Sequence, residues 1–198
     1  MSQFEAVKTY ELAMNFWHLT FNASQEVIKS GNPSCMLYDG WGSPTDEELD
    51  DYMKWSDVYL IEPILFNFYH GIELSLKSLL IAKGINTKNS HKLSALLDDV
   101  IKSYSNVSVI SFYRKYIVHD DNPQILKDFC KYSNVTMDLY FQSLKYPTST
   151  KGAEFDHSIL SSHGETGITL FEEISKDIKN TKRLIRELIL GEYKAEFT

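Results

Sequence analysis

The stretch "PILFNFYHGIELSLKSLLIAKG", residues 63–84, decides the fold of this 198-residue chain. It is apolar on nearly every face, which predicts a central, buried helix. Glycine often follows the last residue of a helix, so we expect the helix to end just before Gly84. Three polar side chains, His70, Glu73 and Lys77, interrupt it at helical spacing. They should share one stripe, in which Glu73 can pair with Lys77.

Helical patterns flank this segment on both sides. Apolar residues recur with a helical period near both ends of the chain, and Gly and Pro fall between the periodic segments. The predicted helices cover residues 3–30, 43–55 (short and acidic), 63–83, 91–104 (capped by Asn89 or Ser90), 108–119, 123–132 and 168–188. Residues 138–160 instead alternate and include Pro147 and Gly152, which predicts a short irregular or hairpin excursion. We therefore expect one all-α domain over residues 1–198, an antiparallel helical bundle.

Composition narrows the class of protein. With 43% hydrophobic residues the chain can bury a substantial core, and a net charge of −7 argues against broad electrostatic binding of nucleic acid. A local basic patch remains compatible with this charge. Two cysteines without a paired motif favour a reducing compartment. Residues 58–76 are too polar for a membrane span, and the N-terminus lacks a signal-peptide pattern. We expect a soluble cytoplasmic protein that does not associate with membranes.

Motifs for common cofactors and metals are absent from the sequence. It contains no P-loop, no GxGxxG and no GxSxG, and therefore we expect no cofactor. Asp156, His157 and His163 lie close together in the sequence, but their spacing fits no standard zinc pattern. We therefore expect no metal site.

The segment from the central helix onward resembles the HEPN superfamily of helical domains. The matching residues are His70, Glu73, Lys77, Gly84, His91 and Leu93, an H-x-x-E-x-x-x-K core followed by a glycine and a His-x-Leu. The stretch "SLKYPTSTKG", residues 143–152, is similar to one in bacterial HEPN-like proteins of unassigned function. The resemblance covers roughly residues 58–190. It implies an antiparallel helical bundle that forms a homodimer. It also implies a role in toxin–antitoxin, phage-defence or RNA-processing systems, with RNA, a nucleotide, or an antitoxin or nucleotidyltransferase-like protein as partner.

Active members of the superfamily cut RNA without metal through an R-x4-6-H motif, which Arg114 and His119 match in spacing. Histidine can exchange a proton near neutral pH, and the arginine fork suits phosphate oxygens. On one regular helix the two side chains would point about 140° apart, so the pair works better at a helix end or doubled across a dimer axis. Lys115 stands where the family commonly has Asn, Asp or His. Asp120 and Asp121 would repel phosphate. The alternative is a solvated arginine beside a histidine at a helix end.

A second set of residues offers a binding function without catalysis. His70, Glu73 and Lys77 either line a groove that binds a nucleotide or phosphate, or form a buried pair that fixes the helix in place. In the stretch similar to HEPN-like proteins, Lys145, Tyr146 and Lys151 could hold a phosphate, or could belong to a polar turn. These six residues are the candidate ligand-binding residues of a helical module that binds a nucleotide, a nucleic-acid end or a protein.

Overall fold

The computed structural model describes residues 3–33, 44–87, 90–145, 157–161 and 165–195, which form helices without any β-strand. This confirms the predicted all-α class. The helices are α1 (Gln3–Ser30), α2 (Asp46–Met53), α3 (Asp57–Ala82), α4 (Leu93–Ser103), α5 (Val107–Ile117), α6 (Gln124–Tyr132), α7 (Met137–Lys145) and α8 (Glu165–Ala195), with short 3-10 turns η2 (His119–Asp121) and η3 (His157–Ile159). Among the described residues, no helix is both long and apolar enough to cross a membrane.

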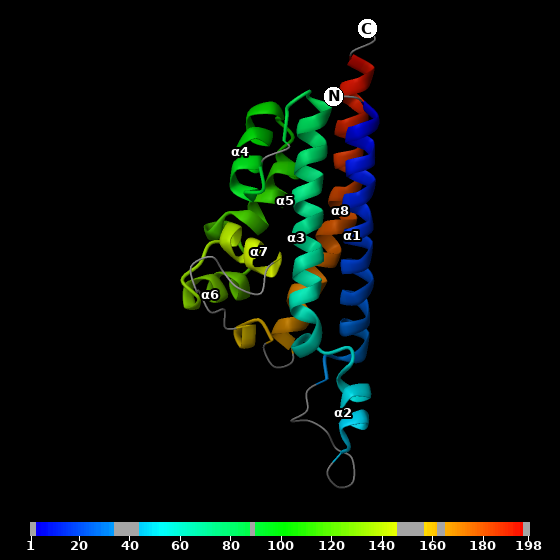
Figure 1. Ribbon diagram of the computed structural model, residues 1–198, viewed down its shortest axis with the longest axis vertical. Coiled ribbons are helices and arrows are strands. Elements are labelled where there is room, and N and C mark those ends of the chain that lie inside the picture. Colours follow the sequence, from blue (N-terminus) through cyan, green and yellow to red (C-terminus); the bar gives the residue numbers. More distant parts are fainter. Residues whose placement is uncertain (1–2, 34–43, 88–89, 146–156, 162–164, 196–198) are drawn as a thin grey trace.

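Three long helices, α1, α3 and α8, lie side by side and form the body of the molecule (Figure 1). The chain runs along α1 in the direction opposite to α3 and α8, so the predicted antiparallel bundle is confirmed. The short helices α4 to α7 lie on the side of α3 that faces away from α1 (Figure 1). Consequently α3, the helix predicted to be central, is covered from both sides.

Close approach of α1 and α3 depends on Trp17 and Gly71. The indole of Trp17 is fully buried, and its Nε1 donates a hydrogen bond of 3.1 Å to the carbonyl oxygen of Phe68. A Cβ on Gly71 would lie 2.3 Å from Cδ1 of this indole. Only glycine lets the indole lie against the α3 backbone, since any side chain here would overlap the ring.

The C-terminal end of α3 agrees with the prediction from the sequence, whereas its start does not. Gly84 has a φ of +74°, its N–H donates to Ile81 O, and the N–H of Ile85 donates to Leu80 O. This is the predicted glycine-terminated helix end. The start differs, because α3 begins at Asp57 after the Ser56 cap and runs through Pro63. Pro63 is exposed, so water can satisfy the backbone carbonyl that loses its partner to the proline.

The excursion predicted around residues 138–160 is wrong over its first part, because residues 137–145 form helix α7. Met137, Tyr140 and Phe141 are buried and Leu144 packs against the core. These positions are i, i+3, i+4 and i+7, which is the spacing of one helix face. The prediction missed this helical period because the aromatic residues of the segment favour β-strands. Residues 146–156, the middle of the predicted excursion, lie outside the described residues.

The start of α4 is also set differently from the prediction. Lys92 occupies the N-cap position of α4 without a side-chain hydrogen bond, so Ser90 does not cap this helix, and Asn89 lies outside the described residues. Asp138 of α7 takes that role, since its Oδ1 accepts a hydrogen bond of 3.0 Å from the backbone N–H of Ser94. An acid on a neighbouring helix therefore replaces the local cap.

Candidate functional site

The candidate catalytic pair lies where α5 ends. The helix stops at Ile117, two residues earlier than predicted, and Val118 is extended with φ −92° and ψ 120°. His119 then opens the 3-10 turn η2. Asn122 secures this end, because its Nδ2 donates a hydrogen bond of 2.9 Å to the carbonyl oxygen of Lys115. His119 is therefore displaced from the helical position that would have pointed it away from Arg114.

Both members of the pair reach solvent. The side chain of Arg114 is 48% exposed and that of His119 is 58% exposed. The Nε of Arg114 donates a hydrogen bond of 2.9 Å to Asp121 Oδ2, and His119 Nδ1 lies 3.4 Å from Asp120 Oδ1. In the part of the chain that the structure describes, no hydrogen bond involves the two terminal amino groups of Arg114. The arginine can therefore offer both terminal amino groups to a phosphate while Asp121 holds its Nε–H.

Lys115, the departure from the family motif, faces another helix. Its ammonium lies 2.7 Å from Asp177 Oδ2 and 3.1 Å from Glu173 Oε2, both on α8. The hydroxyl of Tyr116 donates to the same Asp177 oxygen at 2.9 Å. Burial would lower the pKa of Lys115, but the hydrogen bonds to Asp177 and Glu173 outweigh it and the pKa is raised. Lys115 thus ties α5 to α8, a role that sequence reasoning missed because both acids lie about sixty residues away.

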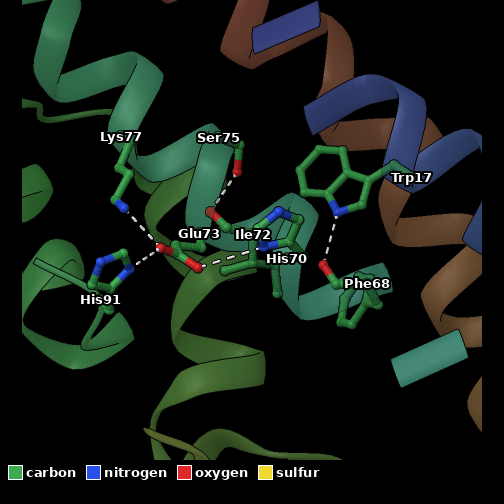
Figure 2. Close-up of polar contacts among 8 residues, drawn as sticks. All are labelled: Trp17, Phe68, His70, Ile72, Glu73, Ser75, Lys77 and His91. Carbon is green, nitrogen blue, oxygen red and sulfur yellow. Dashed lines mark hydrogen bonds and ion pairs between the residues drawn. The ribbon is translucent and has the colours of Figure 1, made fainter. Parts of the chain in front are cut away.

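The polar stripe of α3 forms a compact cluster with His91 around the Glu73 carboxylate (Figure 2). The Glu73 carboxylate is 2% exposed and lies 2.7 Å from Lys77 Nζ, whose side chain is 13% exposed. His91 approaches from the segment before α4 and places its Nδ1 2.8 Å from the same Glu73 oxygen. The predicted pairing of Glu73 with Lys77 is present, and His91 is a third member that the sequence showed only as a nearby motif residue. Because these groups bind one another, the cluster is built as a tie between α3 and the start of α4.

His70 lies beside this cluster but is enclosed mainly by rings. Its centroid is 4.4 Å from that of Phe16 in an edge-on arrangement and 5.8 Å from that of Phe66 in a stacked one. Its Nδ1 lies 3.6 Å from Glu73 Oε2, too far for a hydrogen bond. No other described residue bonds this nitrogen. His70 therefore packs between α1 and α3, and its part in binding a ligand stays a prediction.

The remaining predicted ligand-binding residues lie at or beyond the end of α7. Lys145 is the last residue of α7, and nothing is described of its side chain. Tyr146 and Lys151 lie outside the described residues. Their part in binding stays a prediction. Across the described ranges, no group of three or more His, Cys, Asp or Glu side chains is placed to hold a metal ion.

Comparison with protein families gives one match. The model of the HEPN domain matches residues 49–143, a segment that begins within α2 and ends within α7. It contains the Glu73 cluster, Arg114 and His119, whereas α1 and α8 lie outside it. Comparisons with curated proteins and with solved structures found no match. The HEPN domain indicates a nucleic-acid-related function. The match over residues 49–143 supports membership of the HEPN superfamily.

Proposed function

We propose that this protein is a metal-independent endoribonuclease of the defence or toxin type, with Arg114 and His119 in its active site. The observation that carries the proposal is the break in α5 at Val118, which leaves both side chains exposed on either side of a helix end. Both residues lie within the segment that matches the HEPN domain. An exposed imidazole and an exposed guanidinium whose terminal amino groups are available both suit chemistry on a phosphodiester.

The reaction is an internal transfer of a phosphoryl group. The 2′-oxygen of one nucleotide attacks the adjacent phosphorus, a base takes the 2′ proton, and the bond from phosphorus to the 5′-oxygen breaks. An acid gives a proton to that leaving oxygen. The products are a 2′,3′-cyclic phosphate and a 5′-hydroxyl. His119 would transfer protons, and the guanidinium of Arg114 would stabilise the charge that develops on the phosphorus oxygens.

A homodimer would supply the second proton-transfer group. Each chain offers one histidine of the R-x4-H motif, whereas the reaction needs both a base and an acid. HEPN domains often dimerise. Two copies related by a two-fold axis would bring two arginines and two histidines to one cleft.

The test is cleavage of cellular RNA in excess EDTA. We expect the wild-type protein to give fragments that end in 2′,3′-cyclic phosphates, and His119→Ala and Arg114→Ala to lose activity by at least about a hundredfold. Arg183→Ala is the matched control, because Arg183 is also exposed and also directs its Nε at a carboxylate, that of Glu187. Cleavage that persists in both variants would refute this site, and absence of cleavage by every protein would favour the non-catalytic binding module.

Mixing wild-type chains with His119→Ala chains tests the shared cleft. If each cleft needs the histidines of both copies, a mixed dimer is inactive. After co-refolding of equal amounts, the activity per wild-type chain should then fall to about half, because about half of the wild-type chains have a variant partner. If each chain carries a complete site, the activity per wild-type chain stays unchanged, and the composite site is refuted while the catalytic residues stand.

A further inference from the structure

We propose that the seam between α1 and α8 is a docking groove for an acidic amphipathic helix of a protein partner. Two hollows lie along this seam, of about 210 Å³ and about 250 Å³. Neither helix belongs to the segment that matches the HEPN domain. The proposal is therefore independent of the proposed nuclease site.

The floor of the groove is apolar. Met14, Phe21 and Ile178 line the first hollow, and Val7 and Ile189 line the second. The lining residues of α1 span residues 7–22, which corresponds to roughly 22 Å of helix at 1.5 Å per residue. The centres of the two hollows are separated by two to three turns. An amphipathic helix presents apolar anchors at such spacings when it lies in a groove.

One rim of the groove is cationic. Lys179, Lys182 and Arg186 are exposed and follow one another at i, i+3 and i+7 on α8. None of the three forms a salt bridge with another residue that the structure describes. Among the residues that line the two hollows, Glu11 is the sole carboxylate. In a chain with a net charge of −7, a row of cations that form no salt bridge with a described residue is complementary to an acidic partner.

The groove suits a protein helix better than single-stranded nucleic acid. Nucleic acid bound without sequence preference needs aromatic faces on which bases stack. Here Trp17 is fully buried, and its N–H is bonded to Phe68. The Phe21 ring is covered by the ammonium of Lys179 at 4.6 Å. Tyr10 donates its hydroxyl to the carbonyl oxygen of Lys182. The aromatic rings in the groove are therefore engaged within the protein.

Selection from a displayed peptide library tests the proposal on the full-length protein. The library holds helical peptides of about 16 residues, apolar on one face and randomised among Glu, Lys, Gln and Ser beside it. We expect enrichment of Glu at the positions that flank the apolar face. Binding should weaken at least about tenfold in a Lys179→Glu, Lys182→Glu variant. Arg183→Glu is the control, since Arg183 is exposed on the same helix but does not line either hollow.

A second variant tests the shape of the first hollow separately from the charge of its rim. Asn22→Trp places a bulky ring at an exposed position that lines the first hollow, and it should weaken the selected peptides without changing the net charge. Enrichment of Lys over Glu would overturn the proposal, and so would failure to enrich any peptide. It would also be overturned if Arg183→Glu weakened peptide binding as much as Lys179→Glu, Lys182→Glu does. Binding of a labelled single-stranded RNA that is lost in Lys179→Glu, Lys182→Glu, with no peptide enriched, would assign the groove to nucleic acid instead.

Discussion

Replacement of Lys77 by methionine should strongly destabilise the protein, because it leaves the Glu73 carboxylate buried with one partner fewer. The two charges are 2.7 Å apart, and the carboxylate is 2% exposed. Methionine keeps the length and apolar contacts of the lysine stem but removes the ammonium. Removing one member of a buried pair costs about 3–5 kcal/mol, and we expect about 3 kcal/mol because His91 remains at 2.8 Å. For a domain of this size that lowers Tm by roughly 6–12 °C.

The matched control is Lys54→Met. Lys54 Nζ lies 2.7 Å from Asp51 Oδ1, the same separation, but the two side chains are 55% and 76% exposed. Exposed ion pairs contribute about 0–1 kcal/mol, since water screens them and holding the side chains costs entropy. The two variants therefore differ in burial and not in the distance between the charges.

Urea unfolding followed by far-UV circular dichroism measures both effects as changes in the free energy of unfolding. The double variant Glu73→Gln, Lys77→Met should be more stable than Lys77→Met alone, because it leaves no buried charge without its partner. If Lys77→Met and Lys54→Met cost the same, the Glu73 cluster would not be the tie between helices that we describe. A double variant with a lower free energy of unfolding than Lys77→Met would equally contradict the buried-charge argument.

Three further predictions concern separate parts of the molecule. Gly71→Ala should lower the free energy of unfolding by about 1–3 kcal/mol or more, because the added Cβ overpacks against the indole of Trp17. Gly191→Ala meets no atom within 4 Å of its added Cβ and should raise the free energy of unfolding by up to about 1 kcal/mol. Urea unfolding measures both changes. Asp121→Asn should raise the rate of RNA cleavage up to about fivefold, because a surface salt bridge of at most about 1 kcal/mol no longer competes with phosphate for the guanidinium; an unchanged rate would remove Asp121 from the site. Burial raises the pKa of the Cys130 thiol to about 11. After Cys35 is replaced by serine, the native protein at about pH 8 should therefore react with iodoacetamide far more slowly than the urea-unfolded protein, and equal rates would contradict this burial.

Short-range signals account for what the sequence predicted well. The bounds of α1 follow from apolar periodicity and from the Gly31–Asn32–Pro33 stop. Gly84 ends α3 because a left-handed residue is needed there, and glycine adopts that conformation at least cost. The sequence alone also drew attention to Arg114, His119 and the Glu73–Lys77 pair, because helical spacing and a short motif reveal residues that lie close along the chain.

Long-range contacts decided what the sequence left open. The aromatic letters of α7 favour a strand locally, but packing against α3 buries them on one helical face. Whether Glu73 was buried could not be read from its spacing to Lys77. Burial and the third partner, His91, appear only when the segment before α4 is placed against α3. Lys115 likewise acquires its role from two acids of α8.

By itself, then, the sequence determined the helical class, most helix ends and the residues of the candidate catalytic pair, since each depends on neighbours within a few positions. Only the tertiary structure decided which polar groups are buried and which face solvent. It placed the Val118 break between Arg114 and His119 and formed the two hollows of the proposed docking groove from α1 and α8, at opposite ends of the chain. The physical reason is that solvent exposure and charge pairing depend on every element that packs around a residue, and no local pattern encodes that packing.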